Sequence, residues 1–595
     1  MDHSAASLLR PRSTRTRTVT DLNGAWKFAF SGLDAPADQW RNGVPGRTLA
    51  AVPGAWNEQL PDGLNQFQVG WYERRIDGPE PDGRRRLLRF DAAALVATVW
   101  LDGELVGSHE GGFLPFAFDI TDRLTPGREH LLAVRVEHGT SHLRTPVGGR
   151  PGAGPLMGHP GTSYDFFPFG GLIRPVYLLA VPEQAITGVQ ASTRAIGTGG
   201  SLDIQVQVAD GFNGEVRASV RGENLPTASA GVQGGVASLE LGAGALQAWS
   251  PANPQLYDIQ IELLDGARVV DSYVQPVGLR TIEVADGALL LNGEPVFLKG
   301  FGKHEDFPVV GRGLCEPVIV RDSELMRWVG ANSYRTSHYP YAEQALEVAD
   351  RTGLLVISET SAVGLNFYDE PQNDVARLAW VRRELEALIA RDRNHPSVIA
   401  WSVANEPFAK PLFMPGAAAP ESVKRGLDFL GALVEDARRL DPDRPVMVVG
   451  AQGHPEEFLD LGDIIAVNRY FGWYTEAGRP QDGAKQLEAD LDALHARFNK
   501  PILVAEFGVD TLPGCHSAEA EMWSEEYQSR FIELYLDVIA ARPFIIGAHV
   551  WNFADFKTSQ NILRAGGLNH KGVFTRDRRP KLAAHTLRRR WGGDQ

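Results

Sequence analysis

The sequence predicts a multidomain protein in which two β-sandwiches precede a C-terminal (β/α)8 barrel, the TIM-barrel fold. A chain of 595 residues is too long for one hydrophobic core, so several domains are expected. Short runs of β-branched and aromatic residues occupy the chain up to Arg280, and such runs alternate with helical stretches beyond it. We therefore expect a jelly-roll β-sandwich over residues 1–181, an immunoglobulin-like β-sandwich over 182–279 and the barrel over 280–595.

The two expected sandwiches are predicted from short strands separated by turn signals. In the first, the clearest runs are 87–90, 96–106, 131–136 and 176–181, and Asp102-Gly103 is typical of a tight hairpin. In the second, Leu202, Ile204 and Val206 alternate with polar residues, which indicates a strand with one buried face. The stretch 228–235 is rich in Gly and Ala, and we interpret it as a turn.

The barrel is predicted from eight candidate strands that alternate with helical stretches over roughly 300 residues. Apolar residues recur at helical spacing between them, for example at Val423, Leu427 and Leu430. The carboxyl ends of barrel strands form one rim, where catalytic side chains are placed. The expected strands are 296–300, 332–335, 354–359, 398–402, 446–450, 464–468, 502–506 and 545–552.

The fourth and the seventh of these strands are followed by, or end in, a glutamate. Glu406 follows the apolar run V-I-A-W-S-V-A-N and is stopped by Pro407, and Glu506 ends the run P-I-L-V-A-E. Their separation of 100 residues (506 − 406) leaves room for about three βα units, which places them on strands four and seven. Each alone has an ordinary interpretation as a helix-capping or solvated loop residue. Together they form the pair of carboxyl groups that glycoside hydrolysis requires, one as an acid and one as an anion.

Composition and charge exclude several classes of function. The net charge of −15 argues against nucleic acid or an anionic membrane as the main partner. Cys315 and Cys515 have neither metal-ligand nor disulfide-framework spacing, so we expect no metal site and a reducing compartment. The sequence has no apolar run of about 18 residues and no secretory segment at its N-terminus, so we expect a cytoplasmic protein.

Longer motifs resemble a known family. The segments W-S-V-A-N-E-P, A-E-F-G-V-D-T, G-F-G-K-H-E-D and A-N-S-Y-R-T-S-H-Y-P-Y, which begin at Trp401, Ala505, Gly300 and Ala331, resemble glycoside hydrolase family 2. Within that family, N-R-Y-F-G-W-Y, W-N-F-A-D-F and N-H-K-G-V-F-T-R-D-R look like the β-glucuronidases; they occupy 468–474, 551–556 and 569–578. The resemblance covers nearly the whole chain and implies the same order of three domains.

The resemblance implies a retaining, exo-acting β-glucuronidase that works by double displacement without a metal or other cofactor. Glu406 would be the acid/base and Glu506 the nucleophile, with Tyr470 and Asn405 supporting the nucleophile. Asp165 would reach in from the first domain to a sugar hydroxyl, and an N-x-K pair would bind the uronate carboxylate with an arginine nearby. The implied substrate-binding residues are Asp165, His304, Asn405, Asn468, Tyr474, Trp551, Arg564, Asn569 and Lys571. Arg335, His338 and Glu359 also lie near strand ends, and we assign them to the barrel floor or to a structural carboxylate network.

Several alternatives remain open from the sequence. One is a β-galacturonidase, and another is a neutral-sugar β-glycosidase such as a β-galactosidase, against which the N-x-K pair argues. A protein that binds carbohydrate without catalysis is the alternative from another class. The expected ligands are small β-glucuronides or the ends of glycoconjugates, and the resemblance implies a homo-oligomer, a tetramer.

The sequence departs from the family pattern at three places. Leu568 separates the double glycine from the N-x-K pair, and P-F-G-G stands at 168–171 where the family often has N-Y-A-G. Little sequence lies between Gly364 and Val381, so the long active-site loop of some relatives is expected to be absent.

Overall fold

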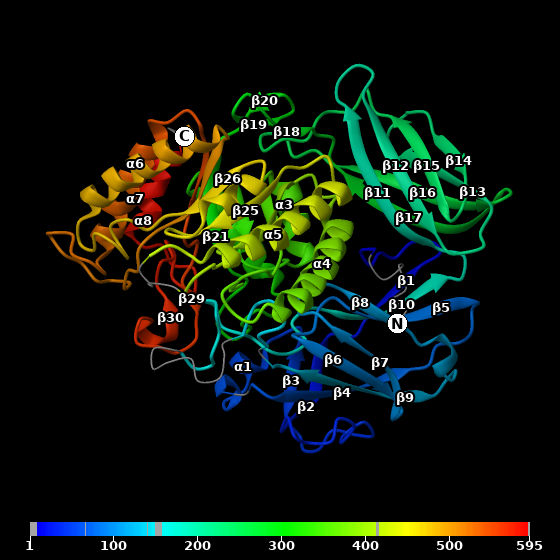
Figure 1. Cartoon of the computed structure of the whole chain (residues 1–595). Helices are drawn as coiled ribbons and strands as arrows, with labels where there is room; N and C mark the ends of the chain where they lie inside the picture. The colour runs from blue at the N-terminus through cyan, green and yellow to red at the C-terminus, as the bar shows by residue number, and fades with distance from the viewer. Residues whose placement is uncertain (1–8, 66, 140, 149–157, 412–415, 593–595) are drawn as a thin grey trace.

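The computed structural model contains two β-sandwiches and a closed barrel of eight parallel strands, the predicted fold class (Figure 1). It describes residues 9–592 except 66, 140, 149–157 and 412–415. In Figure 1 the N-terminal sandwich lies beneath the barrel, and the second sandwich lies to one side of it. Within the described part of the chain, no helix is long and apolar enough to span a membrane.

The N-terminal sandwich packs a four-stranded sheet on a six-stranded one. Its core is aromatic, with Trp26, Phe28, Trp56 and Tyr72 buried between the sheets. The first sheet has the order β1 (Thr18–Asp21), β10 (Val176–Pro182), β5 (Arg84–Phe90) and β8 (Phe116–Asp119). The second has the order β3 (Leu49–Val52), β2 (Gly24–Ser31), β4 (Val69–Asp77), β9 (Glu129–Glu137), β6 (Val96–Leu101) and β7 (Glu104–Glu110).

The hairpin predicted at Asp102-Gly103 joins β6 to β7. Asp102 has a φ of 51° and Gly103 a φ of 82°, as a two-residue turn between twisted strands requires. The short helices of this domain are α1 (Trp56–Gln59) and two 3₁₀ turns, Gly63–Asn65 and Thr121–Arg123.

The second sandwich pairs a three-stranded sheet with a four-stranded one. The alternating residues of the sequence, Leu202, Ile204 and Val206, are fully buried between the sheets. The first sheet has the order β11 (Ile186–Ala195), β12 (Ser201–Val208) and β15 (Val236–Gly242). The second has the order β14 (Ala228–Gly231), β13 (Glu215–Val220), β16 (Tyr257–Asp265) and β17 (Arg268–Val277).

One prediction for this domain was wrong in part. The stretch 228–235, interpreted as a turn, begins with the strand β14, which pairs antiparallel with β13. Because β14 is an edge strand, pairing with one neighbour outweighs the weak strand preference of its Ala and Gly residues.

The barrel strands follow the chain in order, and β21 and β28 close the circle. All eight predicted strands are present, within a few residues of their predicted ends. They are β21 (Leu298–Lys303), β22 (Ser333–Thr336), β23 (Leu355–Glu359), β24 (Val398–Asn405), β25 (Val446–Gly450), β26 (Ile465–Asn468), β27 (Ile502–Phe507) and β28 (Ile545–Val550).

Helices cover the outside of the barrel and short strands complete its two ends. The helices are α2 (Glu316–Trp328), α3 (Glu343–Thr352), α4 (Gln372–Asp392), α5 (Pro420–Leu440), α6 (Pro480–Phe498), α7 (Glu525–Ala540) and α8 (Leu582–Trp591), and the 3₁₀ helix Glu456–Leu461 follows β25. A small sheet of β18 (Ile282–Ala285), β19 (Ala288–Leu291) and β20 (Glu294–Pro295) precedes β21. Beyond β28, β29 (Phe556–Lys557) pairs with β30 (Leu568–Asn569), and the 3₁₀ turn Ala565–Gly567 precedes β30.

The N-terminal sandwich contacts the rim of the barrel where the catalytic glutamates are expected. Phe167 donates its backbone N–H to the carbonyl of Lys557, beyond β28, over 2.8 Å. Arg174 forms an ion pair of 3.0 Å with Glu305, beyond β21. A loop of the first domain is therefore part of the mouth of the barrel.

Candidate active site

Glu406 and Glu506 lie at the same rim of the barrel, on its fourth and seventh strands. Glu506 belongs to β27, and Glu406 directly follows the last residue of β24. The backbone N–H of Glu406 donates to the carbonyl of Val449 in β25, over 2.8 Å. Its φ of 49° is unusual for a residue with a side chain, and such conformations concentrate at functional sites.

Glu506 is held by donors on both carboxylate oxygens. The hydroxyl of Tyr470 donates to Oε2 over 2.6 Å, and the guanidinium of Arg335 donates to Oε1. Nε2 of His338 lies 3.7 Å from the same Oε1. Donors and a cation around a carboxylate stabilise its ionised form, which is the form that a nucleophile needs.

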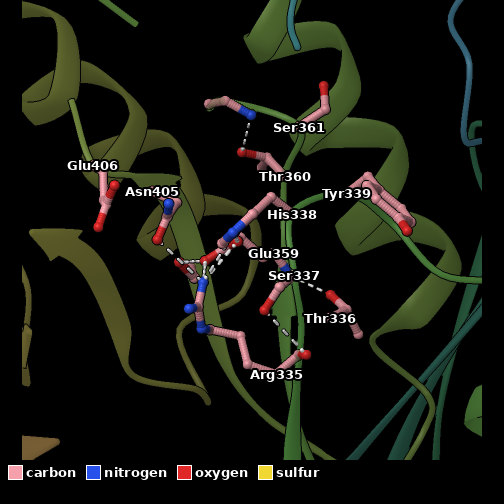
Figure 2. Close-up of polar contacts among 12 residues, drawn as sticks. Arg335, Thr336, Ser337, His338, Tyr339, Glu359, Thr360, Ser361, Asn405 and Glu406 are labelled. Carbon is pink, nitrogen blue, oxygen red and sulfur yellow. Dashed lines mark hydrogen bonds and ion pairs between the residues drawn. The ribbon is translucent and has the colours of Figure 1, made fainter. Parts of the chain in front are cut away.

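Arg335 takes part in a carboxylate network, one of the two roles expected for it from the sequence, and this network includes the expected nucleophile. The same guanidinium donates to both oxygens of Glu359, over 2.9 and 2.7 Å, so it bridges two carboxylates. His338 also contacts Glu359, with Nδ1 at 2.7 Å, and Figure 2 shows these side chains converging below Asn405. Burial would raise the pKa of Glu359, but the attraction of Arg335 and His338 outweighs it and lowers that pKa.

Glu406 has the opposite environment. Its carboxyl group accepts one hydrogen bond within the described chain, from Nδ2 of Asn468 over 2.8 Å, and Figure 2 shows this group apart from the arginine network. Burial, followed by repulsion from Glu506, raises the pKa of Glu406 to about 7. The two carboxyl groups are therefore matched to different tasks, one as a proton donor near neutral pH and one as an anion.

The amide of Asn405 is oriented by its neighbours. Its Oδ1 accepts from Arg335 over 3.3 Å and from Nδ2 of Asn468 over 3.2 Å. Because the oxygen is occupied, Nδ2 remains as a donor, and it has no hydrogen-bond partner among the described residues. A free amide donor on the residue before Glu406 is suited to a sugar hydroxyl.

Aromatic and imidazole rings form a wall beside the carboxyl pair. Trp551 stacks on His338 with ring centroids 5.1 Å apart and meets His304 edge-on at 5.4 Å. Phe166 of the first domain lies 5.1 Å from His304. Burial, followed by repulsion from His338, lowers the pKa of His304, so the ring is neutral. Nε2 of His304 is buried without a partner in the described chain, which leaves a polar atom available to a ligand.

A cluster of charges lies near Tyr470, with Nζ of Lys571 at 5.9 Å from the centroid of its ring. Asn569 and Arg564 both donate to the carboxylate of Asp165, Asn569 through Nδ2 over 2.7 Å and Arg564 through Nε over 2.8 Å. Nζ of Lys571 contacts the carboxylate of Asp510 and donates to the hydroxyl of Tyr474 over 3.1 Å. The structure thus places the predicted carboxylate-binding residues next to Asp165 of the first domain, for which the prediction was a contact with a sugar hydroxyl.

The sequence analysis missed Asp510. It lies four residues beyond Glu506, inside the motif A-E-F-G-V-D-T, and it is 1% exposed. Burial would raise the pKa of Asp510, but Lys571 and Arg564 outweigh that effect and lower it. The available signal was a second acidic residue just past Glu506. Its contacts with the N-x-K segment could not be predicted from the spacing of residues in the sequence.

The departures from the family pattern leave these positions intact. Leu568 and Asn569 form β30, which pairs with β29, so the extra residue is accommodated in a two-stranded ribbon. Helix α4 begins at Gln372, so residues 360–371 alone connect it to β23. Among the described residues, no group of three or more His, Cys, Asp or Glu side chains is placed to hold a metal ion.

Comparison with known proteins agrees with this architecture. Three family models match: the sugar binding domain of glycosyl hydrolases family 2 over residues 19–182, the central family 2 model over 184–280, and its TIM barrel domain over 282–593. A β-glucuronidase of Paenibacillus borealis is 37% identical over 606 aligned positions, covering 98% of both chains. A β-glucuronidase of Rattus norvegicus is 34% identical and covers 98% of this chain and 92% of its own.

Solved structures give the same result. The β-glucuronidase of Bifidobacterium dentium, complexed with coumarin-3-O-glucuronide, superposes with a TM-score of 0.92 at 35% identity, covering 99% of each chain. The β-glucuronidase of Ruminococcus gnavus superposes with a TM-score of 0.89 at 34% identity, covering 98% of this chain and 99% of its own. With three family models in the predicted order and full-length relatives above 30% identity, the chain belongs to glycosyl hydrolases family 2.

Proposed function

We propose that this glycoside hydrolase is an exo-acting β-glucuronidase that retains anomeric configuration. The observation that carries the proposal is a buried ammonium group one aromatic ring away from the expected nucleophile. Nζ of Lys571 lies 5.9 Å from the ring centroid of Tyr470, whose hydroxyl binds Glu506. A sugar that reaches Glu506 with its anomeric carbon can therefore reach Lys571 and Asn569 with a carboxylate at its other end. The names of the full-length relatives support the same substrate.

In the proposed first step, the Glu506 carboxylate attacks the anomeric carbon and the bond to the aglycone oxygen breaks. Glu406 gives its proton to that oxygen, which the pKa of about 7 favours at neutral pH. The product is a glycosyl ester on Glu506 and a free aglycone. Asn405 donates to the 2-hydroxyl through its unoccupied amide N–H.

In the proposed second step, water attacks the anomeric carbon and the ester oxygen of Glu506 leaves as a carboxylate. Glu406, now ionised, takes the proton from that water. The negative charge of Glu506 helps to raise the pKa of Glu406, and formation of the ester removes that charge. The pKa of Glu406 therefore falls during the first step, which helps Glu406 to release its proton then and leaves it ionised as the base of the second step. The net result is D-glucuronate in the β configuration.

A panel of aryl glycosides tests the substrate. We expect turnover of the β-glucuronide to exceed that of the galacturonide, galactoside, glucoside and mannoside, with the β anomer as the first product in proton NMR. Lys571→Ala should lower kcat/KM for the glucuronide by about a hundredfold, because a charge-assisted hydrogen bond contributes about 1.5–3 kcal/mol. Weak activity on the glucoside should stay unchanged, since that sugar has no carboxylate. Equal losses on both substrates would contradict the assignment of Lys571, and an initial α product would contradict retention.

We also propose an oligomeric state and a cellular location for this enzyme. The resemblance to the family supports a homo-oligomer, a tetramer, and the cysteine content supports a cytoplasmic location. Light scattering on the purified chain measures the first. A measured mass of about 65.0 kDa, that of one chain, would contradict the proposed homo-oligomer.

A further inference from the structure

The carboxylate of Asp510 joins the nucleophile strand to the segment that carries the expected uronate-binding pair. Oδ1 accepts the backbone N–H of His570, between Asn569 and Lys571, over 2.9 Å. Oδ2 contacts Nζ of Lys571 and lies 3.3 Å from Nη1 of Arg564. One buried side chain therefore contacts the backbone of this segment and both cations.

We infer that Asp510 is a positioning residue that sets the preference for a uronate by fixing the ammonium of Lys571. This inference rests on the proposed function, and it adds to it a residue that would not touch the substrate.

The surroundings of Lys571 support this role. Its Nζ lies over the rings of Tyr474, Trp473 and Tyr470, at 5.0, 5.5 and 5.9 Å from their centroids. Asp510 is its one anionic partner within the described chain, and the lysine is 1% exposed. Rings attract a cation from several directions without specifying one position, whereas a carboxylate contact does. The position of the ammonium therefore depends on Asp510.

The charges of the cluster explain why a fixed ammonium matters. Without substrate, Arg564 and Lys571 face two carboxylates, Asp165 and Asp510. A bound uronate adds a third carboxylate. The cations therefore strengthen its binding only where their N–H groups already point at it. Asp510 is buried and stays in place, whereas the side chain of Asp165 is 40% exposed. A loosely held Lys571 would turn toward the carboxylate of Asp165 or Asp510, and the enzyme would lose its preference for a uronate.

Asp510→Asn separates this role from simple support of the backbone. Asparagine has nearly the same shape, and its oxygen still accepts from His570, so the change removes the charge and keeps that hydrogen bond. We expect KM for an aryl β-glucuronide to rise by about tenfold or more, which corresponds to about 1.4 kcal/mol of binding. We expect kcat to change less than KM, and the activity on the matched glucoside to stay within about twofold.

Asp555→Asn is the matched control. Asp555 is also buried, pairs with a buried lysine, Lys581, over 2.8 Å, and accepts the backbone N–H of Gly572 over 3.0 Å. Lys581 donates its other hydrogen bonds to the carbonyls of Thr511 and His570, not to the cluster of Asp165 and Arg564. Loss of this pair should change the melting temperature and affect glucuronide and glucoside by the same factor.

A double-mutant cycle with Lys571→Met gives a readout that a purely structural role would not produce. If Asp510 acts through Lys571, adding Asp510→Asn to Lys571→Met should cause no further loss on the glucuronide. Independent, multiplying losses would overturn the inference. So would an Asp510→Asn enzyme that binds the glucuronide as tightly as wild type or more tightly.

The wild-type enzyme in the same assay separates the two hypotheses. A wild type that prefers a neutral glycoside contradicts the proposed function, and the inference about uronate preference falls with it. A wild type that prefers the glucuronide, with the same preference in Asp510→Asn, contradicts the inference alone.

Discussion

The raised pKa of Glu406 predicts how activity depends on pH. As the acid of the first step, Glu406 must carry a proton, so kcat/KM should fall as pH rises through its pKa of about 7. An ordinary glutamate, with a pKa of 4.5, would place this decline near pH 4.5. At pH 8 the raised pKa keeps about 9% of Glu406 protonated instead of about 0.03%, a gain of about 300-fold in active acid.

The assay compares two substrates whose aglycones differ in acidity. With phenyl β-D-glucuronide, expulsion of the aglycone needs a proton. Above the pKa of Glu406, kcat/KM should therefore fall about tenfold per pH unit, and this decline is the alkaline limb of the pH profile. With 2,4-dinitrophenyl β-D-glucuronide, the aglycone leaves without a proton, and the same limb should be much weaker. Glu406→Ala should retain a large part of the first step on the dinitrophenyl substrate and lose most of it on the phenyl substrate.

Two results would refute this reasoning. A wild-type limb near pH 4.5 on the phenyl substrate would show that burial and Glu506 do not raise the pKa of Glu406. A limb near pH 7 that persists unchanged in Glu406→Ala would show that another group supplies the proton.

Three further changes test the same geometry. Glu506→Ala should abolish turnover of every substrate, and trapping with a fluorinated glucuronide should label wild type but not the variant. Tyr470→Phe should lower kcat by about 10- to 100-fold, because it removes the 2.6 Å hydrogen bond to the nucleophile, and wild-type rates would exclude that role. Glu406→Gln should raise the melting temperature at pH 8 and not at pH 4. Between pH 4.5 and 7 the native wild type keeps a proton on Glu406 that the unfolded chain releases, so the stability of the wild type falls as pH rises across this window. Glutamine carries no ionisable proton, so the variant avoids this loss. An equal shift at both pH values would contradict the last prediction.

The barrel could be predicted from sequence because its signals are local. Runs such as 446–450 and 502–506 are short, apolar and rich in β-branched residues, and the structure places β25 at Val446–Gly450 and β27 at Ile502–Phe507. The edge strand β14 was missed because its pairing with β13, and not its own composition, makes it a strand.

The residues of the candidate site could be proposed from the sequence, but the contacts between their side chains could not. The positions of Glu406 and Glu506 follow from where their strands end. The pairing of Lys571 with Asp510 spans 61 residues, and that of Arg564 with Asp165 spans 399. Such contacts depend on how loops and domains dock, which periodicity and spacing do not encode. The same limit explains why the sequence left two roles open for Arg335, the barrel floor or a carboxylate network, and did not show that its guanidinium reaches Glu506 on β27.

The ion pair between Asp165 and Arg564 makes the site a joint product of two domains. Asp165 is synthesised about 400 residues before Arg564, and because the two residues belong to different domains we expect their contact to form only after both domains have folded and docked. A barrel that folds alone therefore has its glutamates in place and an incomplete sugar-binding end. During refolding from denaturant, activity on a glucuronide should return later than the helical circular dichroism signal, which reports mainly on the barrel because the helices lie mainly there. Such a delay would show that domain docking, more than barrel folding, sets when a newly made chain becomes active.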